Sequence, residues 1–213
     1  MGSSLDVCIY LFHRPILIYT TADLICSNEE FSILCKILAE TGYDTIFNYH
    51  DTSVASYSTS TNSTDDEDED ELEELYTVFV PNDEAFKALP RKYAEQLLSS
   101  TENMEWLVLY HSIGVNTVAG AVISSDDLDC GELVRMSNGK NTRTVCESGE
   151  DGAVYQKGAG NSIADDPKKK KRQGEETAAL ALFPEIIEFD IEACNGLVHV
   201  VNNIILPKKL PQQ

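Results

Sequence analysis

Long apolar runs are missing from this 213-residue chain. No segment approaches the ~20 consecutive apolar residues of a membrane-spanning helix, so we expect no transmembrane span. The chain also lacks the Gly-rich loops of nucleotide-binding proteins, the Gly-x-Ser-x-Gly turn of hydrolases and the His-Glu-x-x-His helix of zinc proteases. The absence of a Cys-x-x-Cys pair argues against a zinc or thioredoxin-like site. The sequence therefore predicts no catalytic residue, no cofactor and no metal.

Basic residues are scarce, because 16 Lys and Arg stand against 36 Asp and Glu and give a formal net charge of −20. Nine of the negative charges fall within residues 65–74, and removing these nine leaves −11 for the rest of the chain. This acidic tract lacks the alternating ligands of a calcium loop, so we interpret it as a solvated loop. An acidic surface repels phosphates, so we expect no nucleic-acid partner.

The cysteines are even in number but irregularly spaced. Cys35 lies on the apolar face of a predicted helix, and we interpret it as a core residue. Cys130 and Cys146 lie near the ends of consecutive predicted strands and can pair in an oxidising compartment. The cysteine count alone leaves other connectivities open.

Helix signals dominate the first half of the chain. Ser27 and Glu30 predict a capping box for a helix that Gly42 ends. Asn82 or Asp83 is expected to cap a short helix. Further helices are predicted from residue 90 and over residues 102–113, the latter with a core-facing stripe of Trp106, Leu109, Tyr110 and Ile113.

Strand signals dominate the second half. Asn138-Gly139 and Asn195-Gly196 are turn dipeptides between apolar segments. His199 alternates with Val198 and Val200, so we expect its side chain to face solvent. The predicted strands are 76–80, 118–123, 132–136, 142–146, 153–156, 184–191, 197–201 and 204–206. Early helices and late antiparallel strands predict an α+β domain.

Three segments follow one another in an order typical of a known family. Residues 77–86 combine a buried strand with a helix start, residues 107–111 end in Tyr-His, and residues 195–207 pair a tight turn with an alternating strand. Together they resemble the fasciclin domain family, with the resemblance running from about residue 22 to residue 206.

The resemblance implies a fasciclin-like α+β fold, in which an antiparallel β-sheet wedge packs against a layer of short helices. It also implies mainly structural roles for the residues at the family's motif positions. These are Thr77, Phe79, Asn82, Asp83, Phe86, Tyr110, His111, Asn195, Gly196 and His199.

The Tyr-His motif is associated with integrin adhesion in some animal members of the family. We interpret His111 as a buried histidine whose ring nitrogen bonds to Asp83 or to a backbone carbonyl. The Asp-Ile-Met motif of those proteins has no counterpart that we identify, and residues 125–128 only loosely occupy the neighbourhood of such an element.

The chain is expected to form one fasciclin-like domain over residues 22–207. Two low-complexity insertions are predicted within it, an acidic and Ser/Thr-rich loop at 48–75 and a Lys-rich loop at 157–177. Residues 1–21 form an N-terminal segment to which we assign no role, since they lack the pattern of a signal peptide. Residues 208–213 form a C-terminal tail.

The resemblance predicts a non-enzymatic cell-adhesion or extracellular-matrix module. Its expected partner is a cell-surface or matrix protein or a glycan, with peripheral association at the cell surface and an extracellular location. Asn62 lies in the one N-glycosylation sequon. The alternative is a nuclear or cytoplasmic scaffold that uses the acidic tract and the basic run at residues 168–172, which resembles a nuclear localisation signal. A hydrolase is a third reading, but no nucleophile and base can be nominated for it.

Overall fold

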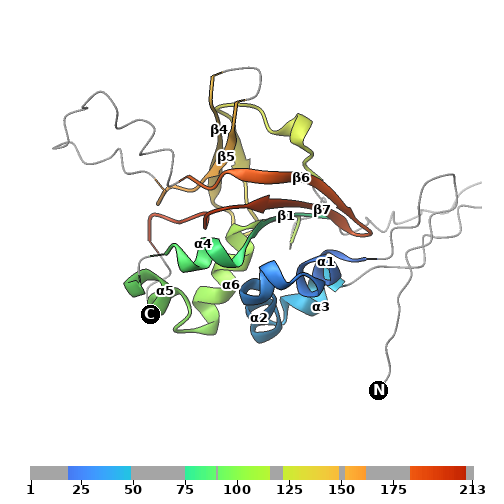
Figure 1. Ribbon diagram of the computed structural model, residues 1–213, viewed down its shortest axis with the longest axis vertical. Helices are drawn as coiled ribbons and strands as arrows, with labels where there is room; N and C mark the ends of the chain where they lie inside the picture. The colour runs from blue at the N-terminus through green and yellow to red at the C-terminus, as the bar shows by residue number, and fades with distance from the viewer. Residues whose placement is uncertain are drawn as a thin grey trace, which may run out of the picture.

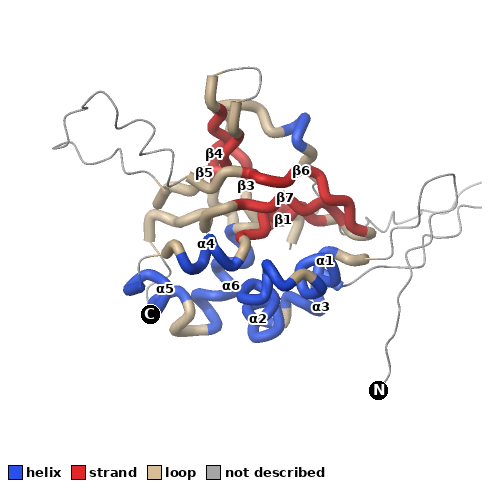
Figure 2. Tube along the Cα trace, viewed as in Figure 1, coloured by secondary structure: helices blue, strands red, loops and turns tan. Residues whose placement is uncertain are grey.

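The computed structural model describes residues 19–48, 75–89, 91–115, 122–148, 152–161 and 183–209, with only the backbone of Lys92. Two small sheets and a layer of short helices make up this part of the chain (Figures 1 and 2). The helices cover one face of the four-stranded sheet, and the three-stranded sheet stands on the other side (Figure 1). The predicted α+β class is confirmed.

The four-stranded sheet has the order β2-β1-β7-β6. Its centre is a parallel pair formed by β1 (Tyr76–Pro81) and β7 (Gly196–Val201), in which Phe79 lies opposite His199. β6 (Ile186–Ala193) pairs antiparallel with β7, and β2 (Ser112–Ile113) pairs antiparallel with β1. The turn at Asn195-Gly196 is as predicted, whereas the parallel pairing joins strands that are distant in the sequence and was not predicted.

Alternation along β1 and β7 creates two apolar clusters. Val78 and Val80 of β1 and Val198 and Val200 of β7 pack in the larger cluster, with the apolar faces of the helices. Phe79 and Val201 belong to the smaller cluster, which also contains Val134 and Met136 from the three-stranded sheet and its β3–β4 connection.

The three-stranded sheet is an antiparallel meander of β3 (Leu133–Arg135), β4 (Asn141–Cys146) and β5 (Val154–Lys157). Gly139 has φ +74° in the turn between β3 and β4, where Asn138-Gly139 predicted a hairpin. A bridge between Tyr155 and Glu185 connects this sheet to the start of β6.

The helical layer contains more short pieces than the sequence indicated. It consists of α1 (Thr21–Ser27), the 3₁₀ turn η1 (Glu29–Phe31), α2 (Ser32–Thr41), α3 (Tyr43–Asn48), α4 (Asp83–Lys87), α5 (Arg91–Leu97) and α6 (Thr101–Tyr110). The longest of these described helices, α2 and α6, have ten residues each, and none is long and apolar enough to cross a membrane.

The predicted capping box at Ser27 and Glu30 is wrong. Ser27 ends α1, whose own capping box is made by Thr20 and Asp23, and Asn28 caps the following 3₁₀ turn. Ser27 and Asn28 are neighbouring candidates for the N-cap, and the local sequence alone does not decide which of them caps the next turn. Gly42 does end α2, in the left-handed conformation (φ +78°).

The predicted core stripe of α6 is only partly correct. Met104, Leu107 and Val108 are buried, while Trp106 and Leu109 are half-buried. The helix ends at Tyr110, so Ile113 lies in β2 instead. The error arises because α6 is apolar on most of its surface, which leaves its periodicity ambiguous.

Two strand predictions also fail in part. Residues 204–206 form no strand, although Ile204 and Ile205 are buried. Val122 and Ile123, the described end of the predicted strand 118–123, form no strand either. Side chains bond to the backbone of Ile123, Ile204, Ile205 and Leu206 in place of a β-ladder.

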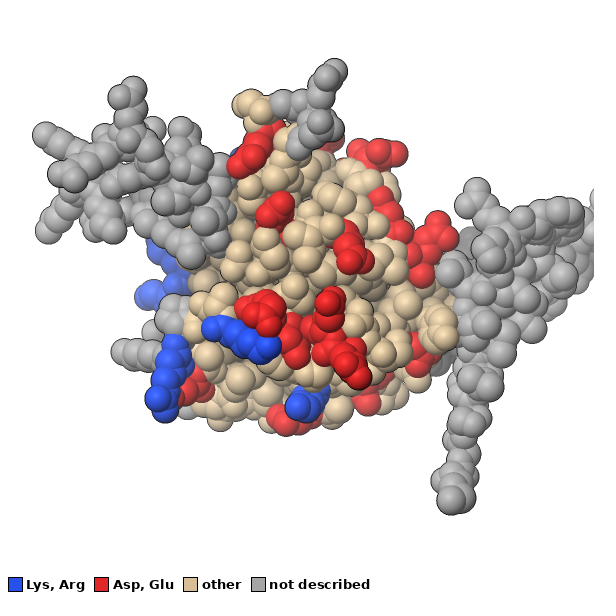
Figure 3. Space-filling model, in the orientation of Figure 1, with Lys and Arg blue, Asp and Glu red and all other residues tan. Residues whose placement is uncertain are grey.

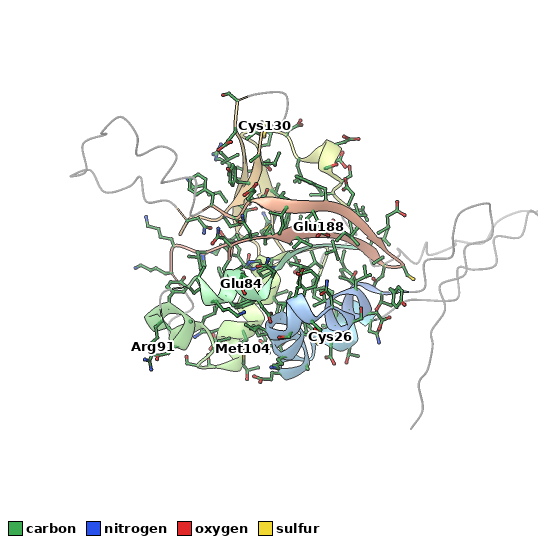
Figure 4. All side chains as sticks on the ribbon, viewed as in Figure 1. Cys26, Glu84, Arg91, Met104, Cys130 and Glu188 are labelled. Atoms are coloured by element: carbon green, nitrogen blue, oxygen red, sulfur yellow. A yellow bond between two sulfur atoms is a disulfide. The ribbon has the colours of Figure 1, made fainter. Side chains whose placement is uncertain are left out.

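Two disulfides lie within the described residues (Figure 4). Cys130–Cys146 joins the two segments for which pairing was considered, with Cα atoms 5.6 Å apart. Cys35 is half-buried against the larger apolar cluster and is also bonded to Cys26, which links α1 to α2. No cysteine in the described ranges is free.

The Gly196→Ala substitution should strongly destabilise the domain. Gly196 has φ +151°, and a Cβ there would lie 1.9 Å from the carbonyl oxygen of Tyr76. We expect the free energy of unfolding, measured with urea, to fall by about 3 kcal/mol. Gly139→Ala is the matched control, because its Cβ would meet only the Arg135 side chain at 3.7 Å and should cost about 1 kcal/mol. Equal losses would show that the approach of Tyr76 is unimportant.

Candidate functional site

His111 is a buried structural residue that connects α6 to the C-terminal segment. Its side chain is 2% exposed. Nε2 accepts from the Ile205 amide at 2.9 Å, so Nδ1 carries the proton and donates to the Leu107 carbonyl at 2.9 Å. Of the two partners considered for this histidine, the backbone carbonyl is present and Asp83 is not. Burial lowers the pKa of His111 to about 4.

Tyr110 is equally buried, at 1% exposure, and packs on Trp106 with ring centroids 4.7 Å apart. Its hydroxyl donates to the Asn141 carbonyl and accepts from the Ala159 amide, both at 3.3 Å. The pKa of Tyr110 is raised by this burial. The Tyr-His pair therefore fixes the core between the sheets, and neither side chain forms a contact surface.

Asn82 and Asp83 cap two different helices. The Asn82 side chain accepts from the Ala85 amide at 2.9 Å and begins its own helix, α4. Asp83 reaches across to α2, where it accepts from the Ser32 hydroxyl at 2.6 Å and from the Ile33 amide at 2.9 Å. α2 has no cap from its own N-terminal residue, so Asp83 satisfies amide groups that the local sequence leaves open.

Asn195 joins three parts of the chain from the turn before β7. Its side-chain oxygen accepts from the amide and the hydroxyl of Thr21, and its nitrogen donates to the Phe47 carbonyl at 2.7 Å. Phe86, the last of the carried-over motif residues, is 7% exposed in the larger apolar cluster. These motif residues hold the helical layer on the sheet.

Three neighbouring strands together hold the segment of residues 122–128, which we term the anchored segment. The Ile123 amide donates to Thr77 Oγ1 on β1 at 2.8 Å, and the Ile123 carbonyl lies 2.9 Å from His199 Nε2 on β7. On β6, the Asp190 carboxylate accepts from the amide of Ser125 at 2.8 Å and from its hydroxyl. The segment therefore lies across the sheet face opposite the helices.

The expectation that His199 faces solvent is wrong, because its side chain is fully buried. It packs between Phe79 and Phe189, at centroid distances of 5.3 and 6.1 Å. Alternation correctly places it opposite its valine neighbours, but that face of β7 is covered by the anchored segment. Burial lowers the pKa of His199, and the bond to Ile123 and the charge of Asp190 oppose the shift.

Asp190 and Asn161 are structural contributors that the sequence did not indicate. Asp190 adopts φ +52° at an irregularity in β6, a conformation that Asp tolerates better than most residues. Asn161 bonds to Ile204 and Leu206, so the described fold extends into the range assigned to the Lys-rich insertion.

Ser125, Asp190 and His199 are the residue types of a hydrolase triad, but their arrangement is not catalytic. The serine hydroxyl bonds to the carboxylate instead of to the imidazole. His199 Nε2 is occupied by the Ile123 carbonyl, and Nδ1 accepts from the Asp190 amide at 3.2 Å. The imidazole does not contact the serine hydroxyl, as a triad requires. Among the described side chains there is also no group of three or more His, Cys, Asp and Glu positioned for a metal.

Several predicted features lie outside the described residues. These are the glycosylation sequon at Asn62, the acidic tract 65–74, the basic run 168–172 and most of both expected insertions. The structure does not test them.

Comparisons with known proteins agree on one family. The family model described as the fasciclin domain matches residues 52–207. The pig (Sus scrofa) protein named transforming growth factor-beta-induced protein ig-h3 is 27% identical over 135 residues, which cover 63% of this chain and 15% of the relative. The chain thus spans only a small part of that protein.

A solved structure has a similar fold. It is a FAS1 domain pair from the insect cell adhesion molecule fasciclin I, with a TM-score of 0.56 and 12% sequence identity. The similarity covers 90% of this chain and 52% of the other. At that identity the likeness concerns the fold alone.

Acid should destabilise the domain through His111. The unfolded chain binds a proton near the ordinary pKa of 6.5, whereas the folded chain does so only near 4. The stabilisation is therefore complete above pH 6.5 and is lost progressively as the pH falls towards 4, by about 3 kcal/mol in all. Urea titrations between pH 7.5 and 4 measure this slope. In His111→Gln the slope should be shallower, and an unchanged slope would contradict the assignment.

Proposed function

Since the chain belongs to the fasciclin domain family, we propose that it is a non-enzymatic cell-adhesion or extracellular-matrix interaction module. The observation that carries the proposal is the family match over residues 52–207, which contains the motif residues of the sheet and of α6. The solved relative comes from an insect cell adhesion molecule, which supports an adhesive role here. A non-enzymatic role is supported by the arrangement of Ser125, Asp190 and His199, in which the histidine does not contact the serine.

Disulfides support an extracellular location for this module. Cys26–Cys35 and Cys130–Cys146 each close a short stretch of chain, with sequence separations of 9 and 16. Such bonds persist in oxidising compartments and are rare in the cytosol. This favours the secretory pathway over the nuclear or cytoplasmic alternative, for which the basic run 168–172 remains the argument.

The proposed partner surface consists of exposed residues, because Tyr110 and His111 are buried. β6 offers such residues, with Ile187 and Phe189 exposed to 44% and 39%. Glu188, between them, lies on the face of the molecule shown in Figure 4. Acidic side chains are spread across this face and gather over the region of α4 (Figure 3). Such a surface favours a basic protein patch or a cation-bridged partner over an anionic one.

A single domain of this kind would adhere through many weak contacts. Clustering of the protein, or a multivalent matrix or cell-surface partner, raises the overall avidity without new contacts. A matrix or surface protein fits the mixed apolar and acidic surface of β6 better than an anionic glycan does. Association with the cell surface would then be peripheral.

The adhesion proposal predicts that β6 variants lose cell attachment. We expect Ile187→Ser combined with Phe189→Ser to reduce attachment to the immobilised full chain severalfold, because these side chains provide exposed apolar contacts. Leu98→Ser is the matched control, since Leu98 is also 44% exposed but follows α5. Urea titrations verify that all variants fold. Equal attachment to the parent and the β6 variant would overturn this surface, and attachment no higher than to an uncoated plate would overturn the adhesive function.

Secretory passage is tested separately from adhesion. The full chain, tagged at its C-terminus and expressed from its natural locus, should be found in the medium or at the cell surface. Its mobility should shift on enzymatic removal of N-glycans and should not shift in Asn62→Gln. An unshifted band in nuclear or cytosolic fractions would instead support the intracellular scaffold.

A further inference from the structure

The anchored segment is held to the sheet by one side chain from each of three adjacent strands. Thr77 on β1 and His199 on β7 bond to the two backbone groups of Ile123. Asp190 on β6 bonds to the amide and the hydroxyl of Ser125. Two of these three anchors, His199 and Asp190, are titratable, and they are also bonded to each other through the Asp190 amide.

The hydrogen-bond partners define the protonation state of His199. The Asp190 amide can only donate, so Nδ1, at 3.2 Å from it, must be the unprotonated nitrogen. Nε2 then carries the proton and donates to the Ile123 carbonyl. The ring is therefore neutral, and the geometry has no place for a second proton.

We propose that the anchored segment is an acid-sensitive cover, released at its β6 end when His199 binds a proton. A proton on Nδ1 would face the Asp190 amide, so two donors would meet and their hydrogen bond would be lost. The new N–H would also compete for the Asp190 carboxylate, which now accepts both bonds from Ser125. Ser125 loses its anchor, so the segment opens from its β6 end towards Ile123.

The surroundings of His199 provide a single nearby counter-charge among the described residues. β1 presents Thr77 and Phe79, which are uncharged, and β6 presents Phe189 and Asp190. Asp126 and Asp127 of the anchored segment are exposed, and the Asp127 carboxylate bonds to Ser124. Asp190 is therefore the carboxylate that responds to the imidazolium.

Proton linkage determines whether acid favours the docked or the released state of the anchored segment. In the released state the ring meets water and has the ordinary pKa of about 6.5. In the docked state, burial lowers the pKa of His199. The released state therefore binds the proton first as the pH falls below about 6.5, and the ratio of docked to released molecules decreases by up to about tenfold per pH unit.

Release would uncover part of the sheet face. Thr77 and His199 are fully buried in the docked state, and Phe79 lies beside them in the smaller apolar cluster. An acidic environment would thus change which residues the module presents. The cover depends on the fold alone, so its failure would leave the proposed adhesion and its attachment assay unaffected.

Native-state hydrogen exchange of the full chain, resolved by NMR between pH 7.5 and 5, tests the proposal. After correction for intrinsic rates, the protection factor of the Ser125 amide should fall by up to about tenfold per pH unit below 6.5. The amide of Val200, in β7 between β1 and β6, reports global opening and should fall less. Parallel losses at Ser125 and Val200 would overturn the proposal.

Two variants distinguish the effect of protonating His199 from that of protonating His111, the other buried histidine. In His199→Gln the difference between Ser125 and Val200 should no longer depend on pH. In His111→Gln that difference should persist, although global stability changes. If His199→Gln does not fold, ring signals of the parent protein decide instead. The His199 ring should titrate together with the loss of Ser125 protection, and a ring that stays neutral while Ser125 is released would overturn the mechanism.

Discussion

The parallel pairing of β1 with β7 is the constraint on which the rest of the structure depends. It brings Phe79 opposite His199 and places the Asn195 carbonyl where the Tyr76 amide donates to it at 2.9 Å. Because side chains alternate, the valines of both strands meet the helices while Thr77 and His199 share the other face. The helical layer and the anchored segment both require this register. A shift of one residue would exchange the two faces.

Buried polar side chains substitute for missing secondary structure throughout the molecule. Asp83 provides the cap that α2 lacks. Asn195 joins the start of α1 to the end of α3. His111 bonds to a C-terminal segment that forms no β-ladder. Each of these bonds satisfies a backbone group that would otherwise be buried without a partner, at a cost of ~1–3 kcal/mol. The motif residues are therefore architectural, and binding is left to exposed positions.

Much of this fold could be predicted from local patterns. Strands β1, β4 and β7, the turns at Asn138-Gly139 and Asn195-Gly196, and the stop at Gly42 follow from alternation and turn chemistry acting over a few residues. The positions that failed depend on distant partners. The alternating pattern around His199 predicts a solvent-facing side chain. The segment around Ile123, 76 positions earlier in the chain, covers it instead. Asp83 resembles a local cap, yet it serves a helix about 50 residues away.

The distance along the chain between β1 and β7 also determines when the fold can form. Tyr76 pairs with Gly196 and Pro81 with Val201, so the central ladder closes a loop of well over one hundred residues. Loop closure on this scale is slow compared with the formation of helices or of the local β3–β4–β5 meander. On the ribosome, β1 would emerge long before its partner and would expose its apolar faces until synthesis passes Val201. A nascent chain of this protein should therefore depend on chaperones during most of its synthesis.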